Sequence, residues 1–189
     1  MKSEHFIYTN RYGKRYYLCE VATKAGKRRL VFASAPRGDP VPAVPEHHEV
    51  VESVRGQVSL RRRGSSPILE REVALVEVEL SRHVRLRSYR AEARKKDIVV
   101  LEASGTDFGA LAEKFGVRML SPSLGLRPTY SPVLRFRLVD PEERRFAVQR
   151  MCYRGSIDGW LSLHDAGPLP SMAARYIPHL GRDSFFELF

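Results

Sequence analysis

The residues best suited to chemistry lie near the N-terminus, where aromatic and basic side chains alternate with short apolar runs. Arginine and lysine can neutralise phosphates, and tyrosine rings can stack on unstacked bases. The candidate nucleic-acid contacts here are Arg11, Lys14, Arg15, Lys24, Lys27, Arg28 and Arg29, with Tyr12 and Tyr16 as optional stacking surfaces. The alternative interpretation is a small sheet with an aromatic core and solvated cations.

A second basic cluster, Arg61, Arg62 and Arg63, follows a predicted strand and precedes Gly64-Ser65-Ser66. Such a run can grip a phosphate as a positioning contact. Basic runs of this kind are more often solvated strand ends, so both interpretations stay open.

Three other groups contain residue types found in metal or catalytic sites, but their spacing along the chain does not match such a site. His47 and His48 are adjacent, and on a strand they point to opposite faces, which disfavours a shared metal ion. Asp158, His164 and Asp165 lie close to Ser156 and Ser162, but no nucleophile-elbow motif accompanies them, and Asp158 favours a turn with Gly159. Cys19 and Cys152 are typical of small buried apolar residues rather than reactive thiols.

The glycines match neither a P-loop nor a dinucleotide fingerprint. The sequence therefore predicts no catalytic residue, no metal and no cofactor, and it favours a protein that is not an enzyme.

The chain ends in an apolar segment, in which Phe185, Phe186 and Phe189 are candidate partner contacts. Terminal apolar helices can dock into a partner groove. We favour the interpretation that this segment packs onto the chain's own core. Docking onto a partner or a second copy gives an alternative function, a protein-interaction or assembly module.

The elements that must position these residues are mostly antiparallel hairpins. Residues 1–35 predict a basic three-stranded meander with turns at Gly13 and Gly26. Residues 36–45 contain four prolines, which predicts a connector that joins no sheet. Residues 46–189 then predict an α+β domain, either separate from the meander or compact with it.

Within that domain, hairpins are predicted around Arg55-Gly56, around Lys95-Lys96-Asp97 and across residues 140–143. An apolar stripe over residues 68–84 predicts a helix, residues 107–116 predict a shorter helix capped by Thr106 or Asp107, and residues 117–132 are expected to be irregular. The segment 155–165 predicts a turn and a short strand, and the tail predicts two short helices broken near Pro178 and Gly181. The fold class is therefore α+β, built from antiparallel hairpins and a meander with a few short helices.

The charge of the chain favours polyanionic partners. The chain of 189 residues carries 32 basic and 22 acidic side chains, a formal net charge of +10. Residues 1–66 hold 13 basic and 6 acidic side chains, a net of +7. Summed positive potential steers polyanions to such a region, although a mildly basic solvated surface explains it equally well. No apolar run is long enough to span a bilayer and no signal peptide is evident, so we expect a cytoplasmic protein with no membrane partner.

Both ends of the chain resemble one family. The opening F-I-Y-T-N-R-Y-G-K-R-Y-Y-L at residues 6–18 is similar to that of a group of uncharacterised bacterial proteins, and so are the stretch Y-R-G-S-I-D-G-W at residues 153–160 and the tail Y-I-P-H-L-G-R-D-S-F-F-E-L from Tyr176. The resemblance covers about a third of the chain. It implies a bacterial protein and carries no activity, ligand or fold.

The sequence thus predicts a non-catalytic nucleic-acid-binding protein that contacts phosphates through its basic N-terminal region. Neither the type of nucleic acid nor the oligomeric state follows from the sequence.

Overall fold

A computed structural model describes residues 4–104, 128–154 and 157–188. The chain divides by its internal contacts into two compact units, which separate between Ser65 and Ser66. Unit 1 is taken here as residues 4–65 and unit 2 as residues 66–104, 128–154 and 157–188. Residues 36–45, the predicted connector, lie inside unit 1. The helix predicted over residues 107–116 lies outside the described residues.

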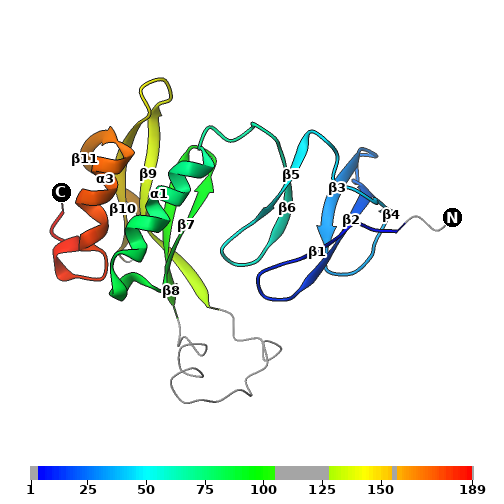
Figure 1. Ribbon diagram of the computed structural model, residues 1–189, viewed down its shortest axis with the longest axis horizontal. Coiled ribbons are helices and arrows are strands. Elements are labelled where there is room, and N and C mark those ends of the chain that lie inside the picture. The colour runs from blue at the N-terminus through cyan, green and yellow to red at the C-terminus, as the bar shows by residue number, and fades with distance from the viewer. Residues whose placement is uncertain (1–3, 105–127, 155–156, 189) are drawn as a thin grey trace, which may run out of the picture. The chain divides into compact units, whose positions relative to one another are not determined.

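Unit 1 consists of short antiparallel strands (Figure 1). Its strands are β1 (Ile7–Thr9), β2 (Arg15–Ala22), β3 (Arg28–Ala33), β4 (Asp39–Pro40), β5 (His48–Glu52) and β6 (Val58–Arg62). The order β1-β2-β3 confirms the predicted meander, and the pairing of β5 with β6 confirms the hairpin around Arg55-Gly56. Positive φ angles at Gly13, Gly26 and Gly56 explain why glycine occupies these turns.

The proline-rich segment does join a sheet, contrary to the prediction. Strand β4 pairs with β2 through Cys19 opposite Pro40 and Glu20 opposite Asp39. It continues the edge where β1 ends, and Phe6 donates a backbone hydrogen bond of 2.7 Å to the Val41 carbonyl. Proline is tolerated because β4 is an edge strand of two residues, where one missing donor costs little.

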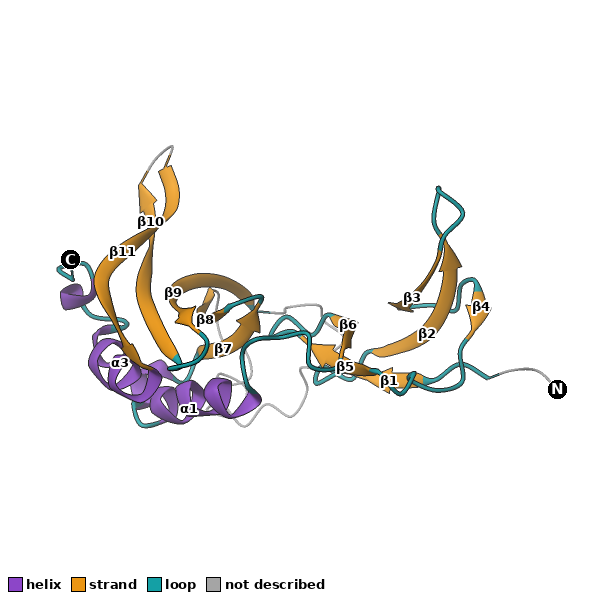
Figure 2. Cartoon of the chain, turned by 90° about the horizontal axis from the view of Figure 1, so that it is seen from above, coloured by secondary structure: helices purple, strands orange, loops and turns teal. Residues whose placement is uncertain are grey.

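Unit 2 is a five-stranded antiparallel sheet with two helices on one face (Figures 1 and 2). The strand order is β11-β10-β9-β8-β7. The strands are β7 (Tyr89–Arg94), β8 (Asp97–Ser104), β9 (Thr129–Asp140), β10 (Arg145–Arg154) and β11 (Ile157–Pro168). The helical elements are α1 (Glu70–Ser81), η1 (Val84–Leu86), α3 (Leu169–Tyr176), η3 (Ile177–His179) and η4 (Asp183–Phe185).

The core of unit 2 lies between this sheet and the helices. Val76 and Leu80 of α1 are buried against it, as the apolar stripe predicts, whereas Val84 is 79% exposed because the helix has already ended. The sheet contributes Leu134, Phe136 and Phe146, which are fully buried. Of the predicted irregular stretch 117–132, the part from Thr129 to Pro132 belongs to β9 instead.

Sheet therefore outweighs helix in the described chain. The predicted hairpins, the helix within residues 68–84 and the helices of the tail are present, but β11 is a strand of 12 residues rather than a short one. Asp158 pairs with Tyr153 inside β11 and does not form the predicted turn with Gly159. No described helix has both the length and the apolar character needed to cross a membrane.

Candidate nucleic-acid interface

The turn between β2 and β3 concentrates the cations of unit 1. The last paired residues are Ala22 and Arg28. Beyond them, Thr23 donates a backbone hydrogen bond of 2.8 Å to the Lys27 carbonyl, and Gly26 donates one of 2.9 Å to the Thr23 carbonyl. The Thr23 hydroxyl also accepts a bond from the Lys27 amide at 3.1 Å. These bonds close a tight turn, so the backbone of residues 24–29 is held close together at one end of the hairpin.

We call Lys24, Lys27, Arg28 and Arg29 the basic hairpin tip. All four side chains are exposed. Arg28 donates to the Glu20 carboxylate at 2.9 Å and lies 3.8 Å from that of Asp39. Lys24, Lys27 and Arg29 form no ion pair with any residue that the structure describes. The tip therefore keeps three cations that a ligand can neutralise without breaking an ion pair.

The ion pair of Arg28 is a weak competitor for a phosphate. The side chains of Arg28 and Glu20 are 68% and 32% exposed, and exposed ion pairs contribute only about 0–1 kcal/mol. A phosphate can replace Glu20 at little cost. Arg28 is thus a fourth cation within reach of a ligand.

Three other predicted cations form ion pairs or hydrogen bonds with residues of unit 1. Arg11 donates to Glu52 at 2.7 Å, and the Glu52 side chain is only 10% exposed. Arg61 donates to Glu49 at 2.8 Å, and Arg63 donates to the His48 carbonyl at 3.0 Å. These contacts tie strands together, so the three side chains serve the fold of unit 1.

The remaining predicted cations do not gather at the tip. Arg15 begins β2, and its pairing with Thr9 places it at the end of the strand opposite the tip. Ala22 lies seven positions after Arg15, which corresponds to about 23 Å of extended strand. Arg62 lies on β6 in the other sheet, opposite His48. Lys14 lies over the Tyr16 ring at 5.3 Å from its centroid.

The two tyrosines proposed for stacking are fastened to the β5–β6 turn. The Tyr12 hydroxyl donates to the Val54 carbonyl at 2.9 Å, and the Tyr16 hydroxyl donates to the Gly56 carbonyl at 3.3 Å. A Cβ atom on Gly56 would lie 2.4 Å from the Tyr12 ring. Both residues therefore join two hairpins of unit 1, and stacking on bases is no longer the best account of them.

Asn10 and Glu52 also join these hairpins, a role that the sequence did not predict. The Asn10 amide donates to the Gly56 carbonyl at 2.7 Å, and its oxygen accepts from the Tyr12 and Lys14 amides at 3.1 and 2.8 Å. Burial alone would raise the pKa of Glu52, but hydrogen bonds from Arg11 and Tyr8 outweigh burial and hold that pKa below its ordinary value. The polar residue type and the turn at Gly13 were visible, but the partners 41 to 46 residues away were not.

Arg135 and Arg137, on the face of the unit 2 sheet that carries no helix, already bind partners within unit 2. Asp97 accepts from Arg135 at 3.2 Å and from Arg137 at 2.8 Å. The Arg135 guanidinium also lies 4.3 Å from the centroid of the Trp160 ring and donates to Gln149 at 2.6 Å. This network explains these arginines as structural, so we place no ligand there.

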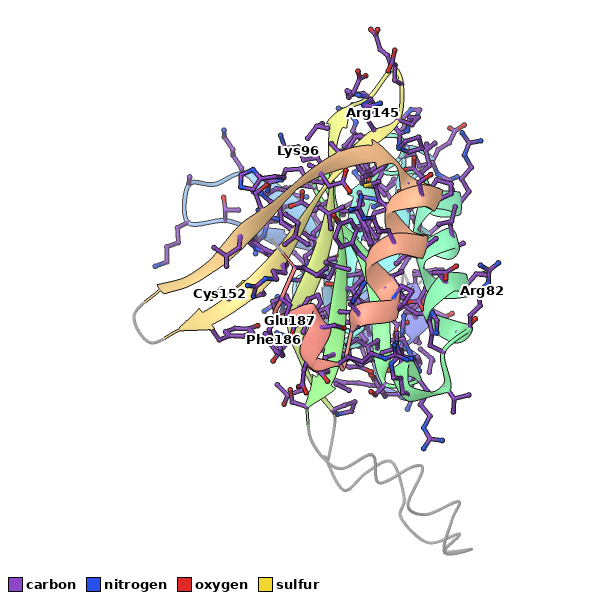
Figure 3. All side chains as sticks on the ribbon, turned by 90° about the vertical axis from the view of Figure 1, so that its left-hand side faces the viewer. Arg82, Lys96, Arg145, Cys152, Phe186 and Glu187 are labelled. Atoms are coloured by element: carbon purple, nitrogen blue, oxygen red, sulfur yellow. The ribbon has the colours of Figure 1, made fainter. Side chains whose placement is uncertain are left out.

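The apolar tail packs on its own unit. Phe185 is 6% exposed and belongs to the core of unit 2, and Leu188 packs against that core. Phe185 is therefore not available to a partner, because its ring is already covered. Phe186 is 65% exposed in the segment after α3 (Figure 3). Phe189 lies outside the described residues.

The weaker candidates for chemistry are not assembled. Asp165 accepts from Arg175 at 2.7 Å and from Tyr176 at 2.9 Å instead of orienting His164. Cys19 is fully buried, as predicted, with its sulfur 3.6 Å from Nδ1 of His5. Within the described ranges, no three histidine, cysteine or acidic side chains converge as a metal site would require.

Comparisons of the chain with models of protein families, with curated proteins and with solved structures find no match. The resemblance of the chain ends to a bacterial family stays a prediction.

Proposed function

We propose that the protein binds nucleic acid without catalysis and that unit 1 contacts phosphates through the basic hairpin tip. One observation carries the proposal: Lys24, Lys27 and Arg29 lie within six residues, exposed and without an ion-pair partner among the described residues. Solvated cations close together at one end of a hairpin raise the local positive potential that attracts a polyanion. A nucleic-acid ligand also fits the cytoplasmic location that the sequence predicts.

The salt dependence of binding tests this proposal. Each phosphate contact on duplex DNA contributes about −0.9 to the slope of log K against log salt. The variant Lys24→Ala/Lys27→Ala/Arg29→Ala should therefore flatten the slope by about 2.7, measured by fluorescence anisotropy with labelled DNA and RNA.

A matched control removes the same charge from unit 2. Arg71, Arg87 and Lys96 are exposed and form no ion pair with a described residue. The variant Arg71→Ala/Arg87→Ala/Lys96→Ala should leave the slope nearly unchanged. Equal flattening by both variants would mean that only the net charge matters, and the assignment to the tip would fail.

A second variant checks the tyrosines. Tyr16→Phe removes the hydroxyl that bonds Gly56 but keeps the ring, so it should leave affinity unchanged, whereas Tyr16→Ala should act only by destabilising unit 1. A loss of affinity in a folded Tyr16→Ala protein would restore stacking as part of the mechanism.

A further inference from the structure

The β2–β3 hairpin extends beyond the rest of its sheet as a two-stranded ribbon. Strand β4 pairs with β2 only at Cys19 and Glu20, so past Glu20 no described strand pairs with either side of the ribbon except the other half of the hairpin. Figure 2 shows this tip standing away from the other strands of unit 1. Two paired rows, Val21 with Arg29 and Ala22 with Arg28, lie beyond Glu20, and the hydrogen bond from Thr23 to Lys27 adds a third step. With a rise of about 3.3 Å per residue, these three steps give a reach of about 10 Å.

These dimensions match one groove. The major groove of B-form DNA is about 12 Å wide and about 8.5 Å deep and admits a two-stranded ribbon. The two strands of a ribbon lie about 4.8 Å apart, which leaves room for a layer of side chains on each face.

The cations of the tip lie on both faces of the ribbon, as contact with the phosphate backbones on both sides of the groove requires. Arg28 and Arg29 are consecutive in β3, so their side chains point to opposite faces of the ribbon. Lys24 and Lys27 lie in the turn itself. A ribbon in the groove would therefore present cations toward both phosphate backbones at once.

The tip also lacks the aromatic rings that bind single strands and the amide side chains that read adenine. Residues 22–30 contain no aromatic side chain, and single-strand binding proteins stack bases on aromatic rings. The stretch contains no Asn or Gln, the residues that pair with adenine edges.

We propose that the basic hairpin tip enters the major groove of B-form duplex DNA and contacts phosphates of both strands. This inference rests on the proposed function and names its ligand. Duplex RNA is excluded as the preferred ligand because its major groove is deep and narrow.

The test compares three probes of one sequence under the same salt: duplex DNA, duplex RNA and single-stranded DNA. The full chain should bind duplex DNA at least about tenfold more tightly than the other two. Glucosylated 5-hydroxymethylcytosine, which fills the major groove, should weaken binding about tenfold, whereas distamycin in the minor groove should not compete. The variant Lys24→Arg/Lys27→Arg should retain binding, and circular dichroism should show that each variant is folded.

The failures of the two proposals are distinguishable. Tighter or equal binding to duplex RNA or single-stranded DNA, or displacement by distamycin, would overturn groove entry while the tip could still bind phosphates. If the Lys24→Ala/Lys27→Ala/Arg29→Ala variant binds every probe as the unmodified chain does, then both the groove and the proposed function are overturned.

Discussion

Asn10 holds unit 1 together at the scale of one residue. Its side chain is 3% exposed and makes three hydrogen bonds, one of them to the Gly56 carbonyl of another hairpin. A buried polar group left without its partner costs about 1–3 kcal/mol. The free energy contributed by this one side chain is therefore a large fraction of the free energy of unfolding of a small domain.

We expect Asn10→Ala to lower the free energy of unfolding of unit 1 by about 2–3 kcal/mol, because two turn amides lose their acceptor and the Gly56 carbonyl keeps only the longer bond from Tyr16. Urea unfolding followed by far-UV circular dichroism would measure the loss. Gln57→Ala, an exposed change in the same turn region, is the control and should have an effect within about 0.5 kcal/mol. Equal effects of the two changes would refute the role of Asn10.

Glu52 makes the stability of unit 1 depend on acid. Its folded pKa lies below the ordinary value of 4.5, so the unfolded state takes up its proton first as the pH falls. The contribution is present above that value and is lost as the pH drops through the folded pKa. Glu52→Gln should lower stability at neutral pH and flatten the decline on the acid side.

Chemical unfolding from neutral pH down to about pH 3 would measure this slope. Glu46→Gln is the matched control, because Glu46 is exposed and forms no ion pair with a described residue. A Glu52→Gln protein that loses stability in acid as steeply as the unmodified chain would show that other carboxylates dominate.

The site could be predicted from the sequence only as a set of residue types. The sequence could place the cations near Gly26 close to one another, because a turn brings together residues that are close in sequence. The commitment of Arg11 to Glu52 and of Tyr16 to Gly56 could not be predicted, since each contact spans 40 residues or more. The sequence therefore predicts more cations and aromatic rings available to a ligand than the structure leaves unbound.

At the scale of elements, local signals predicted hairpins well and long strands poorly. Gly13, Gly26 and Gly56 mark turns that the structure confirms by their positive φ angles. Strand β11 was underestimated because its register with β10 shifts between Ala147 and Gln149, and a bulge of this kind breaks the alternation of side chains. Pro132 likewise lies in β9 near a register shift opposite Leu101.

The tail after α3 is the element on which the alternative function depends. Phe185 is buried in the core, whereas Phe186 is exposed. We expect Phe185→Ala to destabilise unit 2 by about 3–5 kcal/mol and Phe186→Ala to change it by no more than about 0.5 kcal/mol. Urea unfolding would measure both.

Light scattering after size-exclusion chromatography should give the same native mass for the unmodified chain and for Phe186→Ala. A fall in mass on Phe186→Ala would contradict this expectation and would revive self-association through the tail.

At the scale of the whole molecule, the charge and the contacts divide at nearly the same place. The net charge of +7 over residues 1–66 ends where the contacts separate unit 1 from unit 2, between Ser65 and Ser66. The break at Gly64-Ser65-Ser66-Pro67 was visible in the sequence, but the four prolines of residues 36–45 gave the stronger signal for a boundary. The prolines indicate where the chain changes direction, but they do not indicate which unit the segment belongs to. The pairing of β4 with β2 shows that the segment belongs to unit 1.

Two compact units should unfold in separate steps, and the chain carries its own reporter for one of them. Trp160 is the only tryptophan and lies on β11 of unit 2. Its fluorescence should follow unit 2 alone, whereas far-UV circular dichroism follows both units. Unit 1 is small, and a domain of about 60 residues buries only about 60% of its unfolded surface, so it should unfold at the lower urea concentration.

Asn10→Ala should then shift only the first transition, and Phe185→Ala only the second. The two changes lie in different units and should not couple. If Asn10→Ala moves the Trp160 transition as far as the dichroism transition, the units unfold together and unit 1 cannot present the basic hairpin tip as an independent module. If the transitions stay apart, nucleic acid should raise only the first one, because a ligand stabilises the unit that binds it.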